Sequence, residues 1–298
     1  MKLKFNLLYI LVPILIGIIS CKEDFDVTPE RSEFAKLELQ LQDLEDLGPD
    51  YIYEGWVIAD GSAISTGVFT VGSNGKPIKS SFLVEKHALE IATAFVLTIE
   101  PFPDNNPNAS ATHIIGGSFD GNTAELSIGH SSAFNTDFLN STGTFILATP
   151  TDQDLNNENS GIWWLDPNAG PGPSLVLPAL TSGWKYEGWV VIGGIAVSTG
   201  TFTDPNAKDD KNRYGGTIQS PAFPGEDFLF SAPLGLDFPI NLASADVVIS
   251  VEPDPDNAVT PFSLKPLTGI IPHLATDHFS YPMNNTITNK MPSGIAAR

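Results

Sequence analysis

The chain has 298 residues, with 35 acidic side chains against 15 basic ones and a formal net charge of −20. Nucleic acid is excluded as a partner, because a polyanion would be repelled and no basic stripe offsets the repulsion. The only cysteine excludes a disulfide within the chain, so hydrophobic cores must stabilise the fold. The length suggests one large or two medium domains.

Residues 1–20 have the pattern of a secretory signal peptide. Lys2 and Lys4 precede an apolar run at 7–19, which is too short to span a bilayer, and Ser20 stands directly before Cys21. This end resembles the bacterial lipobox, whose cysteine sulfur takes a diacylglyceryl group and whose new N-terminus is acylated, for example with palmitate. A cleaved signal without lipidation would leave a free thiol in an oxidising compartment. We therefore expect lipidation at Cys21 and a membrane contact made through the lipid.

Residues 21–33 are polar and predict a solvated tether between the lipid and the folded part. Lys22-Glu23-Asp24 also resembles the export signal of surface-exposed lipoproteins of the Bacteroidota. The expected location is the cell envelope, as an outer membrane lipoprotein, with exposure on the cell surface as the further expectation. The strongly negative protein surface itself is not expected to bind anionic headgroups.

An internal repeat organises the rest of the chain. The segment at 53–57 (YEGWV) returns at 186–190, and the Ser-Thr-Gly-x-Phe-Thr segment at 65–70 returns at 198–203. A period of this size is far longer than a solenoid repeat and indicates a duplicated domain. We expect the first repeat at 34–150, a linker or connecting strand at 151–173, and the second repeat at 174–298. The residues expected to form the shared core motif are Tyr53, Trp56, Gly67, Phe69 and Glu100 in the first copy, and Tyr186, Trp189, Gly200, Phe202 and Glu252 in the second.

The local pattern within each repeat is typical of β-strands. Leucines alternate with polar residues at 37–42, and β-branched or aromatic runs are bounded by Gly, Pro, Asn and Asp. Dense turn dipeptides and 24 prolines disfavour long helices. The predicted fold is all-β, with two tandem antiparallel β-sandwiches that each have their own core. Trp56 and Trp189 are expected to fill these cores, and Trp163-Trp164 is expected to seal the joint between them.

The motif series resembles the extracytoplasmic C-terminal domain of anti-sigma-K factors of the RskA type. In that family the pattern runs Tyr-x-x-Trp, a Gly-x-Phe element and Val-Thr-x-Glu-Pro, and both copies here match it over about 34–150 and 174–275. The segments after Pro101 and Pro253 depart from the family's Gly-Gly-Ser continuation. The zinc-binding and membrane-spanning parts that reach a sigma factor have no counterpart. The resemblance thus implies a fold and a location outside the cytoplasm, without sigma-factor binding.

The sequence predicts no catalytic residue and no cofactor. No Gly-x-Ser-x-Gly elbow occurs, and the histidines lack short metal spacing. Glu100 and Glu252 recur at equivalent positions, but one lies in each repeat, so no shared cleft for glycoside hydrolysis is implied. A glutamate at a strand end is expected instead to accept backbone N–H groups of the chain that follows.

Two acidic loops offer oxygen ligands that suit calcium. One contains Asp204, Asn206, Asp209 and Asp210, and the other contains Asp254, Asp256 and Asn257. Neither loop has EF-hand spacing, and acidic loops on so anionic a chain are usually solvated, so no bound metal is the preferred interpretation.

Taken together, these features predict an envelope-anchored lipoprotein that acts as a non-enzymatic interaction or structural module, with an unknown protein or glycan partner. The alternative is a polysaccharide-binding or glycan-processing outer membrane lipoprotein. Solvent-facing aromatic residues and paired acids in a pocket would favour the alternative, whereas buried tryptophans would favour the first hypothesis.

Overall fold

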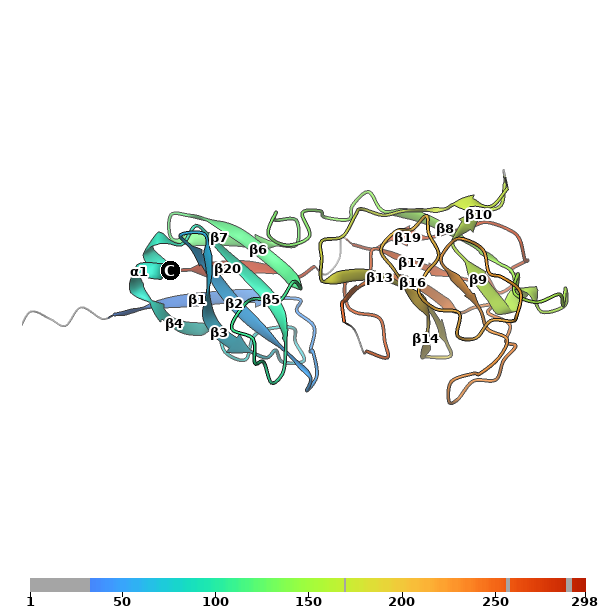
Figure 1. Cartoon of the computed structure of the whole chain (residues 1–298), viewed down its shortest axis with the longest axis horizontal. Helices are drawn as coiled ribbons and strands as arrows, with labels where there is room; N and C mark the ends of the chain where they lie inside the picture. The colour runs from blue at the N-terminus through green and yellow to red at the C-terminus, as the bar shows by residue number, and fades with distance from the viewer. Residues whose placement is uncertain (1–32, 169, 256–257, 288–290) are drawn as a thin grey trace, which may run out of the picture. The chain divides into compact units, whose positions relative to one another are not determined.

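The computed structural model describes residues 33–168, 170–255, 258–287 and 291–298, and residues 33–298 form one compact unit. The signal peptide and Cys21 lie outside the described residues. The regular secondary structure of the described residues is almost entirely antiparallel β-strand, so the predicted all-β, sandwich-type fold is confirmed (Figure 1). Among the described residues, no helix is long and apolar enough to cross a membrane.

The first repeat is built on an eight-stranded sheet. In hydrogen-bond order its strands are β3 (Ser62–Phe69), β2 (Tyr51–Ala59), β5 (Ala94–Pro101), β6 (His113–Asp120), β7 (Thr123–Ser127), β20 (Ser293–Ala297), β1 (Phe34–Gln42) and β4 (Ser81–Glu85). The sheet curves around its core, since Phe82 of β4 packs against Phe69 of β3 with ring centroids 5.9 Å apart. A short helix, α1 (Lys86–Ile91), lies within this repeat and was not predicted; the Glu85 carboxylate caps it.

The second repeat contains a five-stranded sheet with the order β14 (Ile195–Phe202), β13 (Trp184–Ile192), β16 (Asp246–Pro253), β17 (Leu267–Ile270) and β19 (Asn284–Asn285). A second sheet packs on it, with the order β12 (Leu175–Val176), β8 (Thr142–Leu147), β9 (Gly161–Trp163) and β15 (Gly225–Asp227), and with β18 (Tyr281–Pro282) paired to β8. Smaller elements are the ribbon of β10 (Leu165–Asp166) and β11 (Gly172–Pro173), and the 3₁₀ turn η1 (Glu158–Ser160).

The duplication is visible in strand order, register and packing. The order β3-β2-β5-β6 of the first repeat returns as β14-β13-β16-β17, and a β-bulge interrupts the register at Gly55/Trp56 and again at Gly188/Trp189. Tyr53 stacks on Phe69 with ring centroids 5.7 Å apart, and the equivalent pair in the second copy is 5.6 Å apart. In each copy the tyrosine hydroxyl donates to the backbone carbonyl eight residues earlier.

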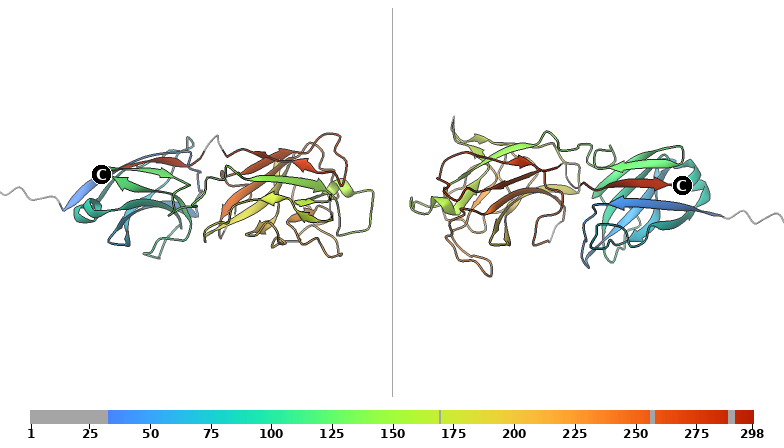
Figure 2. Two further views of the ribbon diagram at one scale, coloured as in Figure 1. Left: turned by 90° about the horizontal axis from the view of Figure 1, so that it is seen from above. Right: turned by 180° about the vertical axis from the view of Figure 1, so that it is seen from behind.

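The sheets do not follow the expected repeat boundaries of 34–150 and 174–298. Strand β8 lies within the first range but pairs with β9, β12 and β18 of the second repeat. Strand β20 lies within the second range but is inserted between β7 and β1 of the first sheet (Figure 2, right, dark red between green and blue). Alternating apolar residues show that a segment is a strand but not which strand it pairs with. The prediction that each repeat is one uninterrupted stretch of the chain was therefore wrong. The short apolar strand expected within 151–173 is β9, and it completes a sheet.

The expectation of two separate cores was also wrong. Buried apolar residues from both sheets form one continuous cluster. Trp184 connects its two parts: its ring centroid lies 4.6 Å from that of Phe134 and 6.1 Å from that of Phe262, and its Nε1 donates to the His113 carbonyl at 3.2 Å. Of the tryptophans, therefore, Trp184 lies at the joint, whereas Trp163 and Trp164 are both buried within the second repeat.

Candidate functional site

A buried polar cluster occupies the face of the first sheet opposite the main core. Tyr53 and Val57 of β2 point into the hydrophobic cluster, so Glu54 and Trp56 point to the other face. There the Trp56 indole N–H donates to the Thr98 hydroxyl at 2.9 Å, and that hydroxyl hydrogen-bonds to the Glu100 carboxylate. The Glu54 carboxylate accepts from the Ser65 hydroxyl. Trp56 is thus buried, as expected, but among polar groups and outside the main core.

The same network is present in the second repeat. Trp189 donates to the Ser250 hydroxyl at 2.8 Å, Ser250 donates to Glu252, and Ser198 donates to Glu187. The second glutamate of each copy also accepts a backbone N–H from the residue ten positions later, at 2.9 Å in both cases. This is the type of contact that the strand-end position of Glu100 and Glu252 predicts.

The sequence interpretation missed three of the five residues of each cluster. Glu54, Ser65 and Thr98, with their counterparts Glu187, Ser198 and Ser250, were not among the predicted site residues. Their signal was available, because each acidic residue and each hydroxyl residue recurs at the equivalent place in both copies. Gly67 and Gly200, which were predicted, have φ of 114° and 131° and lie beside the serines, whose hydroxyls accept their N–H groups.

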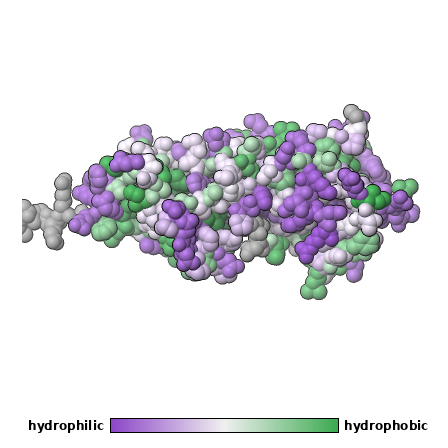
Figure 3. Space-filling model, in the orientation of Figure 1, coloured by the Kyte–Doolittle hydropathy of each residue, from purple (hydrophilic) through white to green (hydrophobic). Residues whose placement is uncertain are grey.

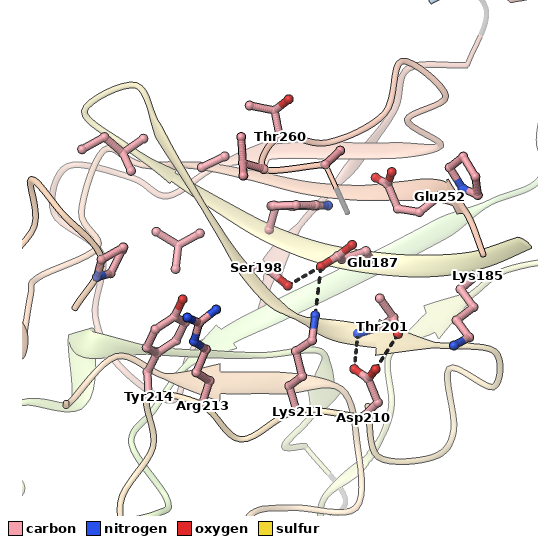
Figure 4. Close-up of a pocket in the computed structure, with 18 of the residues that line it drawn as sticks. Lys185, Glu187, Ser198, Thr201, Asp210, Lys211, Arg213, Tyr214, Glu252 and Thr260 are labelled. Carbon is pink, nitrogen blue, oxygen red and sulfur yellow. Dashed lines mark hydrogen bonds and ion pairs between the residues drawn. The ribbon is translucent and has the colours of Figure 1, made fainter. Parts of the chain in front are cut away.

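A cavity of about 830 Å³ lies over the cluster of the second repeat (Figure 4). It is formed by the strands β13, β14 and β16, by residues 233–234, 253–255 and 258–260, and by an insertion at residues 203–224. The equivalent connection in the first repeat, residues 70–80, is much shorter. The insertion therefore distinguishes the two copies at the same polar cluster.

Three basic side chains line this cavity. Lys185 forms an ion pair with Asp254 at 3.2 Å, and Lys211 of the insertion approaches the Glu187 carboxylate at 3.8 Å (Figure 4). The Arg213 guanidinium lies 5.5 Å from the centre of the Tyr214 ring. Glu187 and Glu252 are almost fully buried beneath these groups. The carboxylates are therefore structural acceptors, and the basic side chains belong to the wall of the cavity above them.

The base of the insertion is held by three buried carboxylates. Asp209 accepts the Gly225 N–H at 2.8 Å, Glu226 accepts the Arg213 N–H at 2.6 Å, and Asp227 accepts the indole N–H of Trp163 at 2.7 Å. Burial raises the pKa of Asp209 and of Glu226 to about 7 and that of Asp227 to about 6, against the opposing effect of these hydrogen bonds.

The predicted calcium candidates do not converge. Asp204 accepts hydrogen bonds from Asn206, Asp210 accepts them from Thr201, and Asp209 points inward to Gly225. Asp256 and Asn257 of the second loop lie outside the described residues. Within the described part of the chain, no group of three or more His, Cys, Asp or Glu residues is placed to hold a metal ion.

We expect the protein to become more stable as the pH falls from 8 to 5. Because burial raises the pKa of Asp209, Glu226 and Asp227, the folded state binds protons in a range where the unfolded chain is still ionised. This stability is present at low pH and is lost as the pH rises through about 6 to 7. The gain should be on the order of 2 kcal/mol in chemical denaturation.

Glu226→Gln should flatten this pH profile, whereas Asp60→Asn, at an exposed turn, should leave its slope unchanged. A profile that falls on acidification in the parent protein would contradict the role of the three carboxylates.

One hydroxyl–imidazole chain lies outside both clusters. The Ser118 hydroxyl is 3.1 Å from Nε2 of His130, whose Nδ1 is 2.8 Å from the Ser132 hydroxyl. Among the hydrogen bonds of the described residues, no carboxylate orients His130, so the arrangement lacks the third member of a nucleophilic triad.

The observations define a class: an all-β protein with a duplicated sheet, a duplicated buried polar cluster, and one cavity-forming insertion. No family model, curated protein or solved structure matches the chain.

Proposed function

We propose that the protein is a lipid-anchored, non-enzymatic interaction or structural module of the bacterial cell envelope. In this proposal its two repeats are anti-sigma-factor-like extracytoplasmic domains without the sigma-binding part. The supporting observation is the duplicated polar cluster. In both copies its carboxylates are at most 8% exposed and accept hydrogen bonds from neighbouring hydroxyl groups, as structural groups do.

The exposure of the aromatic residues supports this proposal over a glycan-binding one. All five tryptophans lie within the described residues, and none is more than 3% exposed, so none can stack on a sugar ring without rearrangement. On the face shown in Figure 3, hydrophobic residues stand in separate groups among hydrophilic ones. Such a surface suits a module whose attachment to the membrane comes from acyl chains.

Replacing Cys21 by Ser should move the protein from the detergent phase to the aqueous phase, or leave it uncleaved. The reason is that acyl chains supply about 0.8 kcal/mol of membrane affinity per buried CH₂ group. Phase partitioning and the mass of the mature N-terminus measure this directly. If the variant partitions like the parent protein, Cys21 does not carry a lipid anchor and that part of the proposal is wrong.

The interaction role is tested by photo-crosslinking in intact cells. A photoreactive residue at Leu234, which is 99% exposed at the rim of the cavity, should capture a defined partner. The same group at Leu155, 81% exposed on a loop away from the cavity lining, is the matched control. Identical crosslinking patterns from the two positions would count against a specific interaction at the cavity.

A further inference from the structure

The edge of the first sheet is open along β3. Within the described residues this strand pairs with β2 alone and stands at the end of the hydrogen-bond order. Its eight residues contain no charge and no proline, two of the features that protect a sheet edge, and its one bulge, opposite Gly55/Trp56, lies before Val68. Ile64 and Val68 are 36% and 42% exposed on it. Such an edge presents backbone N–H and C=O groups to which another strand can add.

In the second repeat the equivalent edge is covered by the insertion. Asp210 donates its N–H to the Thr201 carbonyl of β14 at 2.9 Å, and its carboxylate accepts the Thr201 N–H at 2.7 Å and the Thr201 hydroxyl at 2.9 Å (Figure 4). Thr201 therefore directs its backbone groups away from β13, and Asp210 satisfies both of them. The insertion acts here as a short added segment on the strand edge.

The residue after this contact supplies a positive charge to the polar cluster. Lys211 approaches the Glu187 carboxylate at 3.8 Å, and Glu187 lies opposite Thr201 in the sheet register. Two consecutive residues of the insertion thus have separate roles: Asp210 pairs with the strand edge, and Lys211 places its charge beside the buried Glu187.

The first repeat has the same edge geometry at Val68, where no described segment pairs with its open side; the connection that follows β3 bonds the edge only beyond the strand, where the Ile78 N–H donates to the Thr70 carbonyl at 2.9 Å. Val68 lies opposite Glu54 as Thr201 lies opposite Glu187, so the Val68 N–H and C=O point away from β2 in the same way. No loop in the described part of the chain donates a backbone hydrogen bond to Val68 or accepts one from it. Glu54 accepts from Ser65, and no lysine or arginine forms an ion pair with it among the described residues.

We propose that the edge of β3 binds an extended, lysine- or arginine-bearing segment of a partner protein. The partner's backbone pairs with Val68, and its basic side chain reaches Glu54, as Asp210 and Lys211 do on Thr201 and Glu187. The inference rests on the proposed function, because it names the partner chemistry of an interaction module. Its site in the first repeat is separate from the cavity of the second.

Charge favours this occupant over a second copy of the chain. Burial raises the pKa of Glu54 and the Ser65 hydrogen bond opposes that rise, while the nearby Glu100 and Asp104 carboxylates add to it, so the surroundings of the edge are acidic. A second copy would bring another net charge of −20 to the same edge, whereas a basic segment is attracted to it.

The test uses two labelled octapeptides, one alternating threonine with lysine and one alternating threonine with glutamate, added to the full chain in detergent micelles. Fluorescence anisotropy should show binding of the lysine peptide alone, weakening as salt is added. A photoreactive threonine analogue in that peptide should crosslink to residues 62–69. Val68→Lys should weaken binding at least tenfold through repulsion, and Glu54→Gln at least threefold.

Glu187→Gln, the same change at the occupied cluster, is the matched control and should leave peptide affinity unchanged. Thermal melting checks that each variant folds, and Val68→Pro, which an edge strand tolerates, replaces Val68→Lys where that variant does not. Equal affinity for the parent and the folded Val68 variant, or crosslinks that map away from β3, would overturn the proposal. Concentration-dependent self-association that is abolished by Val68→Lys would also overturn it, by assigning the edge to a second copy. The detergent-partition result for Cys21→Ser does not depend on these outcomes. The proposed lipid anchor and the proposed binding at β3 can therefore be contradicted independently.

Discussion

A chain that ends at Pro292 should lose the fold of its first repeat. The six residues removed include β20, which pairs with β1 over residues 38–42 on one side and with β7 over residues 123–127 on the other. Without β20, β1 retains only β4 as a hydrogen-bonded neighbour, and the sheet is interrupted in its interior. The loss of folding stability should exceed that caused by any single core substitution, because the hydrogen bonds of a whole strand and its buried side chains are removed together.

Arg298 adds to the anchoring of this strand. Its guanidinium donates to the Leu89, Ala92 and Gly121 carbonyls at 2.6 to 3.0 Å and lies 4.3 Å from the centre of the Phe119 ring. Arg298→Ala should therefore destabilise the first repeat by about 1.5 to 3 kcal/mol, the range for hydrogen bonds to a charged group, without abolishing the fold.

Hydrogen exchange with mass spectrometry measures the effect of the truncation by region. Amides of β1, β4 and β7 should lose protection in the shortened chain, while those of β13 and β16 should retain it. A synthetic peptide of residues 291–298 added in trans should restore protection. Unchanged exchange in β1 would show that the first sheet does not depend on its C-terminal strand.

The placement of β20 marks the limit of prediction from sequence. Alternating leucines predicted β1, and the repeated Tyr-Glu-Gly-Trp and Ser-Thr-Gly-x-Phe segments predicted β2, β3, β13 and β14 in equivalent places. These signals are local, so they identify strands well. The segment at 293–297 contains only small residues and one isoleucine, and nothing in it indicates a partner 250 residues away in the chain. Strand pairing over that distance depends on the assembled fold.

The candidate site was predictable in part for the same reason. Glu100 and Glu252 were predicted as motif residues because they recur. No shared site was expected for them because they lie in different repeats. The structure instead brings each of them together with a second glutamate of its own repeat, across neighbouring strands. Glu54 and Glu187 lie opposite Val68 and Thr201 of the edge strands because of the strand register. The bulges at Gly55 and Gly188 shift that register, and the sequence alone does not reveal it.

Trp56→Ala should destabilise the first repeat by about 3 to 5 kcal/mol, because it removes a large buried side chain and leaves a void. It also removes the indole N–H that the Thr98 hydroxyl accepts at 2.9 Å. Trp56→Phe keeps most of the volume and should cost only about 1 kcal/mol, the net value of one hydrogen bond. Chemical denaturation followed by circular dichroism separates the two contributions.

Trp189→Ala should fall at the lower end of the same range, about 3 kcal/mol, although Trp189 is as well buried and donates a matching hydrogen bond to Ser250. The difference comes from the surroundings: Trp189 lines the 830 Å³ cavity, so water can enter the space that the side chain vacates, and the void costs less than a sealed one. Denaturation of the two alanine variants side by side tests this order. If Trp189→Ala proves more destabilising than Trp56→Ala, the cavity is not accessible to water at its floor. If either variant is as stable as the parent protein, that indole does not stabilise its repeat.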